Sequence, residues 1–542
     1  MAFSLIPVAI TPFMNMDAIN LVKMALLGLF AFGSTAFLRK SRFESSEVRW
    51  IFVISLGFCV SMLISASLTN PSFWLQFWGA QGRNSGIFTI MSFILIFFMV
   101  ASKSNSSLGL NIFLAIPFVG LINIIYGLLQ YLDKDPIDWR NPYSPIVGTL
   151  GNPNFISSHL GLVSGACIVL IWYFWHQKKP RRYELSFILL IETFAALFVT
   201  WKSLSIQGLL VFGIVISSTV LLSVIVLLKR KIVTFLITAI SISTALICSF
   251  GFFGNGPLGS LLYRESFVHR THFWEAGIQM LRSNPFTGIG IDQFGDFYRQ
   301  YRSSSAIQLR GPEVVTDSAH NIPIDIASGG GIFPLIFYML IQFTVLFCGL
   351  RMIGRLKEID TVKIGILSLW IGYQAQTLIS INQIGLSIWG WIFSGLVIGL
   401  SLETRSTGSN PLKTTTESFW PRHSVSVAIF GFLGLAMAMP PLLQDRAYRM
   451  ALQTQNGVQI IAASKSYPLN TFYFNYTSIL LNSNGYKSQS LELSKLSVEI
   501  NQRNYLGWRL ILNNSDPGSS DYSLALKNMR LLDPLNDQLP KP

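Results

Sequence analysis

Charged residues are scarce in this sequence of 542 residues, at 12%, whereas hydrophobic residues make up 51%. A soluble domain usually carries about twice that charged fraction, which argues against a soluble globular protein. The hydrophobic residues form runs of about 20, the length that a helix needs to cross a membrane, and these runs lack the alternation of a β-barrel. Because a helix in lipid satisfies its own backbone hydrogen bonds, the sequence predicts an all-α, polytopic transmembrane helical bundle.

Cysteine is also scarce, and the sequence predicts no cleavable signal peptide. The four cysteines lie within hydrophobic runs, which argues against a disulfide framework and indicates small core residues. The first hydrophobic stretch, residues 3–14, contains two prolines and follows no basic segment, unlike a signal peptide. The net charge of +14 comes from short basic clusters between hydrophobic runs. We therefore expect membrane lipids as partners and no nucleic acid.

About twelve hydrophobic runs have the length of a membrane span. Clusters of Lys and Arg follow the first, fifth, seventh, ninth and eleventh runs, and such clusters mark cytoplasmic loops. This alternation predicts that both termini and the long loop at 254–331 lie outside the cytoplasm. The predicted spans are 20–38, 50–67, 86–102, 110–131, 155–175, 184–201, 207–228, 232–252, 332–350, 364–381, 384–402 and 424–442.

The residues after the last span form a second predicted unit. Three similar segments, beginning at Tyr467, Asn501 and Asp533, follow one another at intervals of 34 and 32 residues. A period near 34 is typical of tetratricopeptide helix pairs, and two unrelated amphipathic helix pairs are the alternative. We predict a transmembrane domain at 1–442 and a small extracytoplasmic helical tail at 443–542, which is a binding or docking element.

Candidate motifs occur in the long outer loop and in two shorter outer segments. The long loop contains Arg270-Thr-His-Phe-Trp274, Asn284-Pro-Phe-Thr-Gly-Ile-Gly290-Ile-Asp-Gln-Phe294 and Ser318-Ala-His-Asn321. Gly82-Arg-Asn-Ser-Gly86 precedes the third span, and Gly151-Asn-Pro-Asn-Phe155 opens the fifth. In their order and in their side of the membrane, these motifs resemble those of the O-antigen ligase and O-antigen polymerase superfamily.

The resemblance implies a metal-independent glycosyltransferase with a GT-C-like membrane fold in the bacterial cytoplasmic (inner) membrane. Such enzymes transfer a glycan from an undecaprenyl-diphosphate-linked donor to an acceptor outside the cytoplasm. The acceptor is a glycan, a lipid or a protein, so ligase, polymerase and protein transferase all stay open. No cofactor is expected.

His320 and Arg270 are the candidate catalytic residues. An imidazole titrates in the range of a general base for the acceptor hydroxyl, and a guanidinium binds phosphate oxygens as a planar fork. A loop histidine and a membrane-anchoring arginine without chemical roles are the alternatives. The candidate substrate-binding residues, several of which could instead pack or cap helices, are Arg83, Asn152, Asn154, Lys202, Arg264, Trp274, Arg302, Asn321 and Asp325, with Arg310 as a secondary candidate.

Two positions depart from the family pattern. Many relatives have a Ser-Arg-Gly-like element between the sixth and seventh spans, where this chain has Lys202 and no arginine. Lys202 is the candidate second cation for the diphosphate, as a point charge rather than a fork. Relatives also often have a glutamate at the position of Gly329. Asp325 is the nearest carboxylate, and it would orient His320 from the start of the ninth span.

Metal-dependent glycan transfer is an alternative mechanism, and a transporter and a membrane anchor are the two rival functions. A metal-dependent design uses a carboxylate in the first large outer loop, but residues 68–86 contain no Asp or Glu. Asp133, Asp135 and Asp138 leave a metal open in a later loop, although no His/Cys cluster has zinc spacing. A flippase or transporter for lipid-linked glycans would place ionisable residues within spans, and Glu192 is the clearest of these. A mere anchor for the tail would not need twelve spans.

Overall fold

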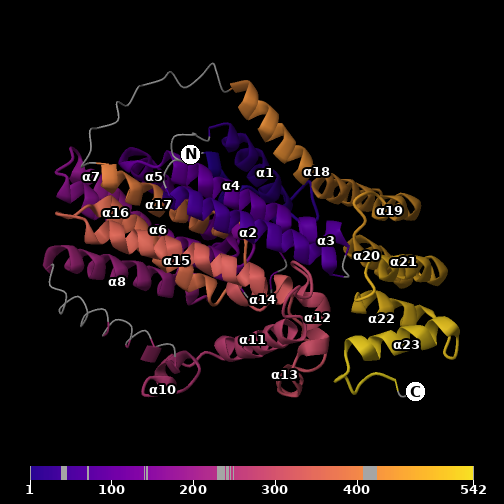
Figure 1. The fold of residues 1–542 in the computed structure, drawn as a ribbon. Coiled ribbons are helices and arrows are strands. Elements are labelled where there is room, and N and C mark those ends of the chain that lie inside the picture. The colour runs from indigo at the N-terminus through magenta and orange to yellow at the C-terminus, as the bar shows by residue number, and fades with distance from the viewer. Residues whose placement is uncertain are drawn as a thin grey trace.

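The computed structural model describes residues 2–37, 46–69, 72–139, 141, 144–228, 250–406 and 424–540, together with residues 239, 243, 246 and 247. Across these ranges the regular elements are helices (Figure 1), as the composition predicts. Eight of them are long and apolar enough to cross a membrane, so the chain is a polytopic helical membrane protein. The predicted span at 232–252 lies largely outside the described residues, and the count of twelve stays a prediction.

The helices of membrane length coincide with the hydrophobic runs of the sequence. They are α2 (Ser46–Leu68), α5 (Ser106–Tyr131), α6 (Pro153–His176), α7 (Arg182–Lys202), α8 (Gln207–Leu228), α15 (Ile332–Gly354), α17 (Ile384–Ser406) and α18 (Ser424–Thr454). Shorter helices in further predicted runs are α1 (Asn20–Ser34), α4 (Ile87–Lys103) and α16 (Thr361–Thr377).

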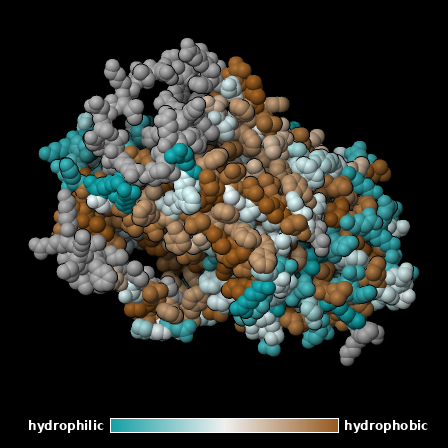
Figure 2. Space-filling view, viewed as in Figure 1, coloured by the Kyte–Doolittle hydropathy of each residue, from teal (hydrophilic) through white to brown (hydrophobic). Residues whose placement is uncertain are grey.

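The bundle has a buried centre and an apolar exterior. The apolar part of α17 is entirely buried, whereas only 28% of the corresponding part of α8 is. Large apolar side chains on outer helices are exposed, including Phe187, Phe194 and Phe343. Figure 2 shows hydrophobic residues across the middle of the molecule and hydrophilic ones over the tail helices. Because soluble proteins rarely expose such extensive apolar surface, lipid is the medium that suits this exterior.

Loops that the charge pattern assigns to one side of the membrane contact one another. Asn20 Nδ2 donates to the Gly82 carbonyl (2.6 Å), and Asn321 Nδ2 donates to the Leu378 carbonyl (2.9 Å). These bonds join loops that are far apart in the sequence at one end of the bundle, which we call the loop end. The compartment that the loop end faces stays a prediction.

The long loop at 254–331 is helical over much of its length. Its helices are α10 (Gly259–Leu262), α11 (Glu265–Ser283), α12 (Phe294–Tyr301), α13 (Ser304–Arg310) and α14 (Ile322–Gly330). Between α11 and α12, Ile289 N donates to the Ser328 carbonyl (2.9 Å) and fastens the chain to α14. Gly288 has a φ of +65°, and a Cβ there would lie 2.3 Å from the Gly329 carbonyl oxygen. Glycine is therefore required for this close approach.

The tail continues directly from the last long helix. Helix α18 runs through the boundary predicted at residues 442 and 443, and α19 (Gly457–Ser464) follows it. Two helix pairs come next, α20 (Thr471–Ser483) with α21 (Lys487–Ile500), and α22 (Tyr505–Asn514) with α23 (Ser520–Leu532). The recurring segments precede each pair, because Asn470 caps α20 and Asn504 caps α22. This spacing agrees with the repeat pattern, while the tetratricopeptide assignment stays a prediction.

The tail is bound to the long loop by a buried ion pair. Asp533, which is 1% exposed, accepts from Arg302 Nη2 (2.7 Å) and from Arg299 Nη1 (3.0 Å). Arg302 Nη1 also donates to the Pro312 carbonyl (2.7 Å). The Nη1 and Nη2 groups of Arg302 are thus used within the chain, whereas its buried Nε has no hydrogen-bond partner among the described residues. Arg302 therefore ties the long loop to the tail, and its contact with substrate stays a prediction.

Candidate functional site

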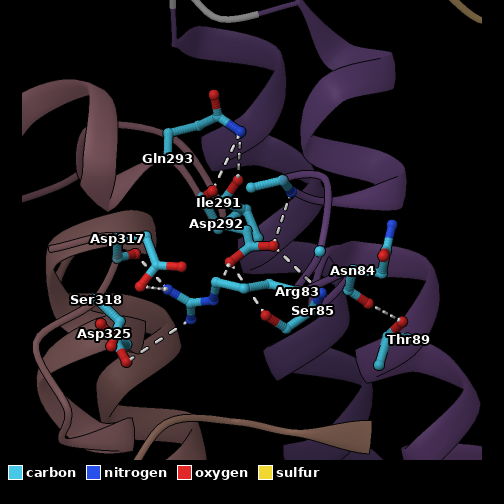
Figure 3. A network of polar contacts seen from close by, with 12 residues as sticks. Arg83, Asn84, Ser85, Thr89, Ile291, Asp292, Gln293, Asp317, Ser318 and Asp325 are labelled. Atoms are coloured by element: carbon cyan, nitrogen blue, oxygen red, sulfur yellow. Dashed lines mark hydrogen bonds and ion pairs between the residues drawn. The ribbon is translucent and has the colours of Figure 1, made fainter. Parts of the chain in front are cut away.

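Arg83 lies at the centre of a cluster of three aspartates at the loop end (Figure 3). It comes from the segment between α3 (Phe73–Trp78) and α4. Its Nε is 3.4 Å from Asp292, its Nη1 3.9 Å from Asp317 and its Nη2 4.0 Å from Asp325, and Nη1 also donates to the Asp317 carbonyl. Arg83 therefore joins the segment before α4 to two parts of the long loop.

Asp292 is held more tightly than the other two aspartates. Its carboxylate accepts from Ala80 N (2.9 Å), Ser85 N (3.2 Å) and Ser85 Oγ (3.0 Å). A Cβ at Gly79 would lie 2.4 Å from Asp292 Oδ2, so only glycine leaves room for this carboxylate. Asp292 and Asp317 were not among the residues predicted from the sequence. Asp292 lies within the Gly-Ile-Asp-Gln-Phe stretch, and that was the available signal.

The cluster has more acidic than basic groups, and Asp292 and Asp325 are largely buried, whereas Asp317 is exposed. Burial raises the pKa of Asp292, and it raises the pKa of Asp325 to about 7, with Arg83 opposing both shifts. One guanidinium cannot balance two buried carboxylates in a low-dielectric site. The cluster can therefore hold a proton close to neutral pH.

His320 lies just before α14 and has an unusual backbone conformation. Its φ is +52°, a left-handed conformation that is uncommon outside glycine and several-fold enriched for His. Asp325 Oδ1 accepts from Ala319 N (2.7 Å), and the His320 ring centroid lies 5.6 Å from that of Phe273. Asp325 thus holds the peptide that precedes His320 from α14 rather than from the start of the ninth span, and its role in orienting the imidazole stays a prediction.

Arg270 is a buried cation on α11, one turn before Phe273. It is 6% exposed, and its guanidinium forms no ion pair with the described residues. It makes a cation–π contact with Phe267, whose ring centroid is 5.0 Å away. Burial lowers the pKa of Arg270 to about 10. A buried charge without an opposite charge is costly, so the position favours an anionic ligand.

Arg270 and His320 act on each other electrostatically. Burial and then the charge of Arg270 lower the pKa of the half-buried His320 to about 4, with Asp317 opposing and Arg83 adding to the shift. The imidazole is consequently neutral at physiological pH and able to accept a proton. The structure thus brings four predicted residues together, namely His320, Arg270, Arg83 and Asp325.

A cavity lies between the Arg83 cluster and the membrane helices. Its empty volume is about 820 Å³, including space open to solvent. Arg83, Asp292 and Asp325 line its polar wall, whereas Phe93 and Trp391 belong to its apolar part. Such a cavity suits a molecule with a charged end and an apolar body. His320 and Arg270 do not line it, but Asp325 connects it to the peptide that precedes His320.

Lys202 lies at the end of α7 among aromatic rings. Its Nζ is 4.3 Å from the ring centroid of Trp201, 5.1 Å from Tyr131 and 5.7 Å from Phe198. These cation–π contacts account for the position of its charge. No contact within the described residues joins Lys202 to Arg270 or His320, so its role as a second diphosphate cation stays a prediction.

The remaining predicted residues have structural contacts. Asn152 caps α6 by accepting from Asn154 N (2.9 Å), which confirms the capping alternative, and Asn154 accepts from Ser205 Oγ (2.8 Å). Asn321 caps α14, accepting from Ile324 N (3.1 Å).

Three further candidates lie in the long loop, on α11, just before it and at the end of α13. Trp274 packs edge-on against Phe253, with ring centroids 6.1 Å apart. Arg264 is exposed and donates to the Tyr263 carbonyl (2.8 Å), and Arg310 is exposed at the end of α13.

The acidic residues that a metal-dependent transferase or a transporter would use do not belong to the Arg83 cluster. Asp135 accepts from Tyr126, Gln130 and Trp139 side chains at 2.9 to 3.0 Å and from Ile137 N. Among the residues that the structure describes, no three His, Cys, Asp or Glu side chains are grouped as metal ligands. Glu192 is buried on α7, and its Oε1 has no hydrogen-bond partner in the same ranges.

The fold and the site define a polytopic membrane protein with a charged site at one end of its helices. Residues 155–339, about a third of the chain, match the family model described as O-antigen ligase. This range contains Arg270, His320 and Asp325 and ends within α15. The chain therefore carries an O-antigen ligase domain, which confirms the resemblance and indicates a membrane enzyme of a glycan-transfer family. The comparison with curated proteins gave no match.

Proposed function

We propose that this chain transfers a glycan from an undecaprenyl-diphosphate-linked donor to an acceptor hydroxyl on the outer side of the bacterial cytoplasmic membrane. The observation that carries the proposal is Arg270, a buried cation without an acidic partner in the described residues, next to the neutral base His320. A diphosphate would supply the missing negative charge. The O-antigen ligase match supports lipid-linked glycans as the class of substrate.

The proposed reaction uses these two residues in different roles. His320 accepts the proton of the acceptor hydroxyl while that oxygen forms a bond to the anomeric carbon of the donor. The bond between this carbon and the diphosphate oxygen breaks, and the lipid diphosphate leaves with the electron pair. Arg270 stabilises the negative charge that develops on the leaving oxygen. Arg83 and Asp325 hold the segments that carry the site.

The proposal predicts a large loss of transfer in Arg270→Gln. Removing one charge-stabilising group typically lowers kcat by about 10²- to 10³-fold. Transfer is measured with purified full-length protein, a lipid-diphosphate donor and EDTA throughout. Arg282→Gln, which changes an exposed arginine of the same helix, is the matched control and should retain activity. Near-normal transfer by Arg270→Gln would remove this residue from the mechanism. Donor flipping in liposomes without transfer by the wild type would instead favour the transporter.

The acidic limb of the pH profile should differ between the free protein and its donor complex. The charge of Arg270 helps to lower the pKa of His320 to about 4, and a bound diphosphate would offset that charge. The profile of kcat/KM reports the free protein and that of kcat the complex. As the pH is lowered, we therefore expect kcat to begin to fall at a higher pH than kcat/KM does. Coincident limbs would contradict the contact between the diphosphate and Arg270.

A further inference from the structure

A second groove lies beside the Arg83 segment, between the bundle and the tail. Its empty volume is about 820 Å³, including open space. Trp74, Trp78 and Asn84 line it from the bundle side, and Tyr467 and Asn470 line it from the tail side. The side chains that line this groove are uncharged. A neutral ligand therefore suits it better than a phosphate or a charged lipid headgroup.

The groove presents aromatic rings in a fixed arrangement. Trp74 stacks on Trp78 with ring centroids 5.2 Å apart, and Tyr467 meets Trp78 edge-on at 6.0 Å. Trp78 Nε1 donates to the Met437 carbonyl (2.9 Å), which fixes the middle ring. The outer rings stay accessible, because Trp74 is 49% and Tyr467 62% exposed. Aromatic faces carry partial negative charge, and the C–H groups of a sugar ring pack well against them.

A buried amide adds an unsatisfied polar group to this surface. Asn84 is 1% exposed, and its Oδ1 has no hydrogen-bond partner among the described residues. A buried polar atom without a partner is costly. Figure 3 places Asn84 on the side of its segment that faces away from the Arg83 guanidinium. A ligand hydroxyl at the groove would satisfy this oxygen.

We propose that this groove binds the sugar rings of the acceptor glycan, an inference that rests on the proposed function. Aromatic rings together with amides match the apolar faces and hydroxyl groups of neutral sugars. Tryptophan and tyrosine also gather at membrane interfaces, so a lipid is the rival occupant. The residues on the tail side of the groove favour a glycan. Contact with lipid would not require Tyr467 and Asn470 opposite Trp74.

The groove is connected to the Arg83 cluster through a short segment of backbone. Gly79 and Asn84 line the groove, while Ala80 N and Ser85 N, next to them in the chain, donate to Asp292. A glycan in the groove therefore lies on the other face of the segment that carries Arg83. This geometry places the acceptor beside the proposed site of transfer.

The test measures binding separately from transfer. Full-length protein in nanodiscs is titrated with a fluorescently labelled, lipid-free oligosaccharide cleaved from the mature surface glycan of the host, so that the probe carries the sugars of the acceptor. We expect binding about three- to tenfold weaker in Trp74→Ala and in Tyr467→Ala, the range for loss of one aromatic contact. Tyr467→Phe, which keeps the ring, should bind as the wild type does. Trp50→Ala, which removes an exposed tryptophan of α2, is the matched control.

Two outcomes would overturn the sugar site. One is equal glycan binding by the wild type, Trp74→Ala and Tyr467→Ala in samples with matching thermal unfolding curves. The other is that the two variants change only the amount of co-purified phospholipid, which would make the groove a lipid contact. His320→Asn should bind the glycan normally. If His320→Asn also transfers normally while Trp74→Ala loses binding, the proposed base fails and the sugar site stands.

Discussion

Replacing His320 with asparagine is expected to lower kcat for glycan transfer by about 10²- to 10⁴-fold, the usual contribution of a general base. Asparagine tolerates the left-handed backbone of this position, where φ is +52°, but its amide cannot accept the proton. The protein should therefore fold and bind the donor normally. Single-turnover transfer and donor binding, measured on the same preparation, separate the two effects.

The matched control for this variant is His272→Asn, on the same loop. His272 lies on α11, and its ring is 3.8 Å from Glu275 in a contact of neighbouring turns. Its replacement should leave transfer close to the wild-type rate. A His320→Asn protein that retains donor binding and more than a tenth of the wild-type kcat would contradict the role of His320 as the base.

Replacing Arg83 with methionine is expected to destabilise the loop end by about 3–5 kcal/mol, the cost of removing one partner from a buried ion pair. The change leaves the buried carboxylates of Asp292 and Asp325 without their cation. Arg351→Met, at the opposite end of the bundle, replaces an exposed arginine and should cost little. Thermal unfolding in detergent micelles would measure both.

The loss in Arg83→Met should grow as the pH rises. Burial raises the pKa of Asp325 to about 7 in the folded protein, against an ordinary value of 3.8. A raised pKa means that this group favours the folded state at low pH and that this contribution disappears as the pH rises through the folded pKa. Without Arg83 that pKa rises further. The variant should thus be closer to the wild type at pH 5 than at pH 8, and adding Asp325→Asn should restore part of its stability. A deficit independent of pH would contradict this account.

Local features of the fold were predictable from the sequence. The hydrophobic runs predicted the long helices, because membrane length and hydropathy are properties of a single segment. The basic clusters predicted that the segments around Asn321 and Leu378 lie on one side of the membrane, and the hydrogen bond between these residues agrees with that. Gly288 and Gly290, which belong to the motif from Asn284 to Phe294, both have a positive φ.

Contacts between distant segments were not predictable in the same way. Arg83 was a candidate, but its pairing with Asp292 joins residues 209 positions apart. Arg302 was predicted to contact substrate, whereas its partner is Asp533, 231 positions along the chain. An arginine indicates a need for negative charge, but the residue type does not identify the group that carries this charge. Only the folded arrangement distinguishes Arg302, which has its carboxylate, from Arg270, which lacks one in the described residues.

The tie between tail and loop has a consequence for biosynthesis. Asp533 is translated after the membrane helices that the structure describes, yet it supplies the carboxylate for Arg299 and Arg302 in the long loop. During synthesis these two arginines lack that partner until the tail has been made and has folded. Assembly of the site is therefore expected to be a late event, completed only after the bundle is already in the membrane.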